Sequence, residues 1–289
     1  MRIFPLFAFL GLVLTVDAQY WIGPKVGYHY TVHDYQDEEY EDMYSISKDR
    51  NYEVGMVLTY TASDRYSVHT ELYYERVGNR VQNKGENFYV DSKSTNAYLS
   101  TPLLLRVSMG HSPVHWYVNG GPKISLWLGG KGELANGDFD EFEEDKLNKD
   151  GYYEYKVAFD RSKAEGLDNG VYYVNEANRF QYSLTVGGGF YLDLANGARL
   201  MFDARYNWGH SNMGFNVDPQ QPGRGTILVG NSTNIPTSGY QENYEFSNNT
   251  MSFSVAYMFE YNTQLKRKGS STSAESQKTK KSVKKKRKN

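Results

Sequence analysis

The sequence predicts an all-β fold, an eight-stranded antiparallel up-and-down transmembrane β-barrel with long extracellular loops and a disordered basic tail. Three observations lead to this prediction. Eight segments alternate apolar and polar residues with a period of two, their apolar sides end in Tyr or Trp, and short and long connections alternate strictly between them. Tyrosine, with 26 copies, and glycine, with 27, are abundant, and no run with helical periodicity is sustained.

The first 18 residues predict a secretory signal peptide. Arg2 precedes an apolar run over residues 3–16, and Ala18 provides the small residue required before cleavage at Gln19. A membrane anchor is the alternative, but this run is shorter than the roughly 20 residues that a spanning helix needs. Beyond Ala18 no apolar run is long enough for a membrane helix, so a membrane protein must cross with strands. We therefore expect a signal peptide over 1–18, a barrel over 19–263 and a tail over 264–289.

The first four expected strands cover residues 20–31, 52–60, 66–75 and 98–107. In each strand the apolar residues share one parity, so they lie on one face of the sheet. These apolar faces comprise Tyr20, Ile22, Val26, Tyr28 and Tyr30; Tyr52, Val54, Met56, Leu58 and Tyr60; Tyr66, Val68, Leu72 and Tyr74; and Leu99, Leu103, Leu105 and Val107. The opposite faces carry Lys25, Gly27, His29 and Thr31; Glu53, Gly55 and Thr59; Ser67, His69, Glu71, Tyr73 and Glu75; and Tyr98, Ser100 and Arg106.

The last four expected strands cover residues 115–128, 181–193, 198–208 and 251–261. Their apolar faces comprise Trp116, Val118, Ile124, Leu126 and Leu128; Tyr182, Leu184, Val186, Phe190 and Leu192; Ala198, Leu200, Phe202, Ala204, Tyr206 and Trp208; and Met251, Phe253, Val255, Tyr257, Phe259 and Tyr261. The opposite faces carry His115, Tyr117, Asn119, Lys123 and Ser125; Gln181, Ser183, Thr185 and Asp193; Arg199, Asp203, Arg205 and Asn207; and Ser252, Ser254, Ala256 and Glu260.

Alternation alone does not tell which face points outward, because a soluble lipocalin-like barrel with an apolar interior gives the same pattern. Tyr and Trp at the ends of the apolar faces favour lipid contact, since aromatic girdles lie at membrane interfaces. The connections 62–65, 110–114 and 195–197 are short, whereas 32–50, 77–95, 129–180 and 209–249 are long. Short periplasmic turns and long external loops are typical of outer-membrane barrels, and an even strand count then places both termini in the periplasm.

The polar faces predict a charged but neutralised barrel interior. Eight strands enclose a space that side chains fill, so we expect no open aqueous channel. The expected lumen ion network consists of Lys25, Glu53, Glu71, Glu75, Arg106, Lys123, Arg199, Asp203, Arg205 and Glu260. Its cations should pair with its carboxylates, because an unpaired charge in a dry interior is costly.

Three histidines are candidate sites of chemistry. His210 and Ser211 resemble the base and nucleophile of lipid A deacylases, but neighbours in a strand point to opposite faces, and a dyad must lie within hydrogen-bond reach. His29 and His69 lie on polar faces near glutamates, where hydrogen-bonded packing is expected over a metal site. We therefore expect no catalytic residue, cofactor or metal, and no enzyme.

Charge is strongly segregated along the chain. Residues 264–289 hold eleven of the 32 Lys and Arg and one of the 34 acids, which leaves 21 basic and 33 acidic residues before them. The tail residues expected to interact are Lys280, Lys281, Lys284, Lys285, Lys286, Arg287 and Lys288. An exported tail does not meet nucleic acid, so it predicts an acidic periplasmic partner, cell-wall polymer or anionic lipid.

Two of the long connections are acidic. They carry Asp34, Asp37, Glu38, Glu39, Glu41 and Asp42, and Asp138, Asp140, Glu141, Glu143, Glu144 and Asp145. A solvated loop is the favoured interpretation, and a bound hard cation is the alternative, although the spacing is not that of an EF-hand.

Four segments carry a resemblance to a known family. Tyr98-Leu99-Ser100-Thr101-Pro102-Leu103-Leu104-Leu105-Arg106, Val118-Asn119-Gly120-Gly121-Pro122-Lys123, Val186-Gly187-Gly188-Gly189-Phe190 and Ala204-Arg205-Tyr206-Asn207-Trp208-Gly209 resemble the PorT-like outer-membrane β-barrels of Bacteroidota. The resemblance covers residues 20–261 and implies an outer-membrane location and an association with type IX secretion and gliding, without catalytic residues. The long 129–180 connection and the basic tail depart from the family pattern.

These features predict a non-enzymatic outer-membrane barrel, an accessory of type IX secretion or gliding that contacts outer-membrane lipid and secretion-system components. A surface ligand-binding or adhesion barrel that acts through its long loops is the alternative. A lipid-modifying barrel enzyme is the third and weakest hypothesis.

Overall fold

The computed structural model describes residues 19–48, 50–83, 90–136, 147–159, 170–174, 177–214, 225–229 and 242–261. Its elements are β1 (Gln19–Tyr35), α2 (Glu38–Met43), β2 (Tyr44–Lys48), β3 (Arg50–Thr61), β4 (Tyr66–Asn83), β5 (Val90–His111), β6 (Val114–Asn136), β7 (Tyr153–Ala158), β8 (Gly170–Val174), β9 (Phe180–Asp193), β10 (Ala198–Gly209), β11 (Gly225–Val229) and β12 (Phe246–Tyr261). The signal peptide and the basic tail lie outside the described residues, as do the acidic residues 138–145.

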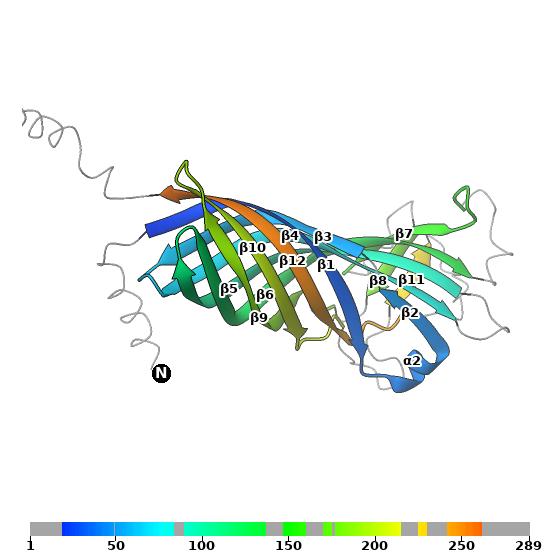
Figure 1. Ribbon diagram of the computed structural model, residues 1–289. Helices are drawn as coiled ribbons and strands as arrows, with labels where there is room; N and C mark the ends of the chain where they lie inside the picture. Colours follow the sequence, from blue (N-terminus) through cyan, green and yellow to red (C-terminus); the bar gives the residue numbers. More distant parts are fainter. Residues whose placement is uncertain are drawn as a thin grey trace, which may run out of the picture.

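Eight of these strands close into a barrel (Figure 1). The ring runs β1–β3–β4–β5–β6–β9–β10–β12, and every neighbouring pair is antiparallel. β12 pairs back with β1 over a register that places Val26 opposite Val255, which closes the barrel and leaves no free edge in it. The predicted eight-stranded up-and-down barrel is confirmed.

The apolar faces of the ring strands point outward. On β5, Leu105 is 71 % exposed while its neighbour Leu104 is fully buried. The same contrast separates Val255, which is exposed, from Ser254, which is buried. Exposed aliphatic and aromatic side chains therefore surround the ring. Such a continuous apolar surface is suited to contact with lipid and not with water. This arrangement excludes the lipocalin-like alternative, whose apolar residues would point inward.

The two ends of the barrel differ (Figure 1). At the turn end, the strands are joined by the short connections 62–65, 112–113 and 194–197, and β1 begins and β12 ends there. Gly197 has φ +79°, a conformation suited to glycine, in the turn closed by the hydrogen bond from Leu194 N–H to Ala198 O. At the other end, which we call the loop end, the long connections begin.

The connections at the loop end contain more regular structure than predicted. β4 and β5 stay paired from Val77↔Asn96 to Gln82↔Asp91, so most of the expected 77–95 loop is a continuing hairpin. β6 likewise continues to Asn136, and β12 begins at Phe246 rather than after 249. The strand pattern fades in the sequence because side chains beyond the lipid belt need no apolar outer face, although backbone pairing persists.

These extensions form a second sheet region, which we call the loop-end sheet. It consists of the parts of β4, β5 and β6 at the loop end together with β2, β7, β8 and β11. β2 pairs with β4, β7 pairs with β6, and β8 pairs with β7 in parallel and with β11 antiparallel. The first acidic connection is not a solvated loop throughout, because it forms α2. Asp37 caps this helix through Tyr40 N–H, and Glu38, Glu39 and Glu41 lie in its first turn, where the helix dipole favours acids.

A tyrosine-rich core fills the space enclosed at the loop end. We call this core the cap; it consists of Tyr35, Tyr40, Val77, Val81, Val90, Tyr98, Trp127, Leu134, Tyr153, Tyr155, Tyr172, Val174, Met213, Tyr244 and Phe246. It joins side chains from the ring strands to α2, β7 and β8. The loop end is therefore a packed body that lies on the barrel.

Candidate functional site

The lumen is the candidate site, and its turn end is closed by apolar side chains. Trp21, Val57, Tyr117, Tyr191, Met201, Ala256 and Met258 form a buried cluster there. The Arg199 guanidinium covers it, 3.7 Å from the Trp21 ring and 4.5 Å from the Tyr191 ring. Sequence reasoning missed this layer because each strand contributes only one or two apolar residues to an otherwise polar face.

The middle of the lumen holds the predicted ion network. Lys25 Nζ lies 2.8 Å from Glu53 and 2.6 Å from Glu71. Arg205 lies 2.7 Å from Glu71 and 2.5 Å from Asp203, and Arg106 lies 3.8 Å from Asp203. All six side chains are buried, and three cations balance three carboxylates. Such mutual compensation is what a dry interior requires.

A second buried pair lies closer to the loop end. Lys123 Nζ lies 2.9 Å from Glu75, and the Ser100 hydroxyl donates to Glu75 at 2.5 Å. Ser100 also contacts the Ser125 hydroxyl at 2.7 Å. Lys123 and Glu75 therefore form a buried, hydrogen-bonded ion pair in which the two charges compensate each other, as predicted.

Two members of the predicted network lie elsewhere. Glu260 is exposed at the turn end and has no ion pair among the described residues, because β12 extends past the lumen there. Arg199 pairs at 2.7 Å with Asp193, a residue outside the predicted set, and both are partly exposed near the turn end. Residue parity predicted the face of the sheet correctly but carried no information on depth.

Inward glycines make room for the long side chains. A Cβ atom on Gly187 would lie 2.6 Å from Arg205 Cγ, and one on Gly55 would lie 2.4 Å from Tyr73 Cβ. Arg205 and Tyr73 are thus packed over the neighbouring strand at positions where no side chain projects. The Val186-Gly187-Gly188-Gly189-Phe190 motif therefore has a packing role in the lumen.

Both lumen histidines form hydrogen bonds through ring nitrogens. His69 lies between the Thr59 hydroxyl, 2.6 Å from Nδ1, and Glu71 Oε1, 2.7 Å from Nε2. His29 Nε2 lies 3.0 Å from the Arg76 carbonyl oxygen. Within the described ranges, no group of three or more His, Cys, Asp or Glu side chains is arranged to hold a metal ion.

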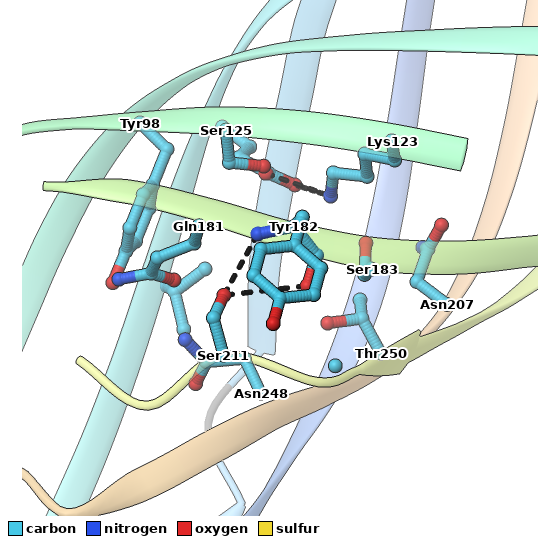
Figure 2. A pocket seen from close by; sticks show the side chains of 13 residues that line it. Tyr98, Lys123, Ser125, Gln181, Tyr182, Ser183, Asn207, Ser211, Asn248 and Thr250 are labelled. Carbon is cyan, nitrogen blue, oxygen red and sulfur yellow. Dashed lines mark hydrogen bonds and ion pairs between the residues drawn. The ribbon is translucent and has the colours of Figure 1, made fainter. Parts of the chain in front are cut away.

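A small polar cavity lies between the Lys123–Glu75 pair and the cap (Figure 2). Its volume is about 30 Å³, enough for roughly two water molecules. Polar side chains surround it, and Val77 and Tyr98 of the cap contribute to its lining. The other lining residues are Glu75, Lys123, Ser125, Gln181, Tyr182, Ser183, Asn207, Gly209, Ser211, Asn248 and Thr250.

His210 and Ser211 do not form a dyad in this arrangement. The Ser211 hydroxyl lines the cavity, accepts a hydrogen bond from Tyr182 N–H at 2.7 Å and contacts Tyr182 O at 3.3 Å (Figure 2). His210 is exposed and packs against the Tyr182 ring, with centroids 5.4 Å apart. The Ser211 hydroxyl thus contacts the backbone of Tyr182, whereas the His210 imidazole contacts its ring.

The cap contains a buried acid that sequence reasoning did not single out. Glu242 is fully buried, and its carboxylate accepts hydrogen bonds from Asn79, Ser94 and Tyr244, each at 3.4 Å. Burial raises the pKa of Glu242 to about 7, although these hydrogen bonds partly oppose the shift. A lone Glu in a connection that is long and polar gives no sequence signal for burial.

Comparison with known proteins identifies the class of this chain. Residues 17–214 match the family model described as outer membrane protein beta-barrel domain, so the chain belongs to this family, and its place is the outer membrane. The curated proteins include no match. Among the described residues, no helix is long and apolar enough to cross a membrane.

Several solved structures are similar at low identity. OprG from Pseudomonas aeruginosa is 12 % identical with a TM-score of 0.44, over 85 % of this chain and 97 % of that one. Neisserial surface protein A is 10 % identical with a TM-score of 0.32, over 82 % and 95 %. Ail of Yersinia pestis, solved with the heparin analogue sucrose octasulfate, is 10 % identical with a TM-score of 0.33, over 84 % and 100 %.

Proposed function

We propose that this chain is a non-enzymatic, non-conducting outer-membrane barrel that presents the loop-end sheet and cap to a binding partner outside the cell. The observation that carries the proposal is the contrast between the two parts. The lumen is filled by an apolar layer and compensated charges, whereas the sheet continues past the lipid belt as a folded body. A filled barrel serves as an anchor, and recognition then falls to what it holds outside the membrane.

The exposed side of the loop-end sheet supports a role in recognition. Lys131 lies directly opposite Lys156, and Glu133 directly opposite Glu154, across the β6–β7 pair. Like charges across a sheet are unfavourable by themselves. Lys93 of β5 lies 3.9 Å from Glu133 and partly compensates the acidic pair, whereas Lys131 and Lys156 have no ion pair among the described residues. An acidic partner would compensate the two lysines.

Site-specific photo-crosslinking in cells tests the proposal. A photoreactive residue at Glu154 should capture a partner macromolecule on the outer surface, while one at Val255, on the lipid-facing side of the barrel, should capture none. The charge reversal Lys131→Glu with Lys156→Glu should abolish the Glu154 product while the barrel remains folded. Equal products from both positions, or a product that survives the reversal, would count against recognition through this sheet.

A second proposal is that the partner belongs to the type IX secretion or gliding machinery. The observation that favours it is the resemblance of the 98–106, 118–123, 186–190 and 204–209 segments to PorT-like barrels. Disruption of the gene should then reduce secretion of type IX reporter proteins, and the intact gene should restore it. Normal secretion and normal gliding in the disrupted strain would leave the surface-binding alternative, in which the chain attaches to a ligand or to another surface.

A further inference from the structure

The buried carboxylates of the lumen and the buried carboxyl of Glu242 have different neighbours. Glu53, Glu71, Glu75 and Asp203 each contact Lys or Arg within 4 Å. Glu242 contacts neither Lys nor Arg in the part of the chain that the structure describes, although it is equally buried. Its polar partners, Asn79, Ser94 and Tyr244, are neutral groups that can also hydrogen bond to a protonated carboxyl.

Glu242 links the parts that close the loop end. Asn79 comes from β4 and Ser94 from β5, while the Glu242 N–H donates to the Tyr172 hydroxyl of β8 at 2.6 Å. The residues that follow Glu242 lead directly into β12, whose Asn248 and Thr250 line the polar cavity. Movement of residues 242–246 away from β4 and β5 would therefore displace Asn248 and Thr250 and widen the cavity at the loop end.

We propose that Glu242 is a proton-controlled latch that holds the cap closed over the polar cavity. The protonated carboxyl keeps residues 242–246 against β4, β5 and β8. The ionised carboxylate has no cation to compensate it in the closed cap, so ionisation favours an opened arrangement in which water reaches this side chain.

The surroundings of Glu242 contain few groups that could titrate instead. Those that face it are Tyr35 of β1, Tyr155 of β7, Tyr172 of β8 and Tyr244 of its own segment, with Tyr40 of α2 behind Tyr35. Two further groups touch the segment that follows it. Asp37, the N-cap of α2, lies 3.5 Å from the Asn243 amide, and His33 of β1 packs on Phe246 with ring centroids 4.5 Å apart. Burial lowers the pKa of His33 to about 4, so this imidazole is neutral in the closed cap from pH 5.5 to pH 8. Burial raises the pKa of Tyr155, Tyr172 and Tyr244 well above 10, so these phenols stay neutral near pH 7. On β4 and β5, the charged pair Arg80–Asp91 has the opposite parity to Asn79 and Ser94 and is self-compensating at 2.6 Å.

The direction of the pH effect follows from the raised pKa. Glu242 binds its proton more tightly in the closed cap, with a pKa of about 7, than in an opened one, where the ordinary value of 4.5 applies. The closed cap is therefore most favoured at low pH, and the preference falls as the pH rises from 4.5 to about 7 and then levels off. Between pH 5.5 and pH 8, the ratio of opened to closed cap should rise roughly 30-fold.

Cysteine labelling of purified barrel in detergent measures this ratio. The chain has no cysteine, so Ser183→Cys places a single thiol in the cavity, and Lys156→Cys provides an exposed control. The maleimide labelling rate of Ser183→Cys, divided by that of Lys156→Cys at each pH, should rise roughly 30-fold between pH 5.5 and pH 8. With Glu242→Gln added, the ratio should stay at its low-pH value. An equal rise in the Gln variant would overturn the latch.

Infrared difference spectroscopy on the unmodified protein keeps the test independent of how the Gln variant folds. The spectrum should lose a protonated-carboxyl band as the pH rises through about 7, in parallel with the labelling of Ser183→Cys. A carboxyl already ionised at pH 5.5, or a band that disappears without any change in labelling, would also overturn the proposal.

Discussion

Arg205 and Glu71 meet across the lumen, with Nη2 and Oε1 2.7 Å apart. They belong to β10 and β4, which face each other across the ring of eight strands. This contact, together with Lys25 and Asp203, joins opposite walls of the barrel through buried charges that compensate one another. We call this network the cross-brace, because it links strands on opposite sides of the barrel. Removing one of its members leaves the buried partners of that residue without full charge compensation.

Replacing Arg205 by Leu should destabilise the barrel strongly. The change leaves Glu71 and Asp203 short of positive charge in a buried site, which costs about 3 to 5 kcal/mol. Denaturant unfolding in detergent, followed by heat-modifiable gel mobility, measures the loss. Arg65→Leu in an exposed turn is the control, and equal stability of the two variants would refute the cross-brace.

A charge on the outer face should act on membrane insertion. Val255 lies opposite Val26 and Phe202, in the middle of the exposed apolar belt. Val255→Arg should therefore disfavour the inserted state by about 2 to 4 kcal/mol. Folding into lipid vesicles measures the effect, with Glu260→Arg at the edge of the belt as the control. If the two variants insert equally well, the face assignment is incorrect.

The inward glycines give a prediction about packing. Gly187→Ala would bring a methyl group to 2.6 Å from Arg205 Cγ and 2.5 Å from the Ala204 carbonyl oxygen. We expect a loss of about 1 to 3 kcal/mol in unfolding free energy from this overpacking. Gly120→Ala is a matched control on an adjacent strand, since its methyl group would have 3.5 Å to the nearest atom. A Gly187 variant as stable as the Gly120 variant would show that Arg205 is not held tightly there.

The basic tail gives a prediction that rests on sequence alone. Truncation after Thr263 should leave heat-modifiable mobility unchanged, because eleven Lys and Arg in 26 residues cannot bury an apolar core. It should also remove a periplasmic partner or polymer whose co-purification weakens with salt, since exposed charges are screened within about 8 Å at physiological ionic strength. Identical bound material before and after truncation, at low and high salt, would leave the tail without a role in binding.

The sequence predicted the ring because lipid imposes a pattern on it. Residues such as Leu105 and Val255 must be apolar, which makes each crossing visible as an alternating segment. No such rule applies inside or above the barrel. Val57 and Met201 share the parity of lumen charges, Glu260 lies beyond the lumen on a lumen-facing parity, and Glu242 gives no signal before folding buries it. The face of a strand residue was therefore predictable, whereas its depth and its partners depended on register.

Conductance across a planar lipid bilayer tests the central claim, that this is a filled anchor rather than a pore. Heat-modifiable, folded protein reconstituted at pH 5.5 and at pH 8 should give no unitary current steps, because the Trp21, Val57 and Met201 layer closes the turn end whatever the state of the cap. A porin in the same membrane serves as the positive control. Stable unitary steps from the folded protein at either pH would contradict the account.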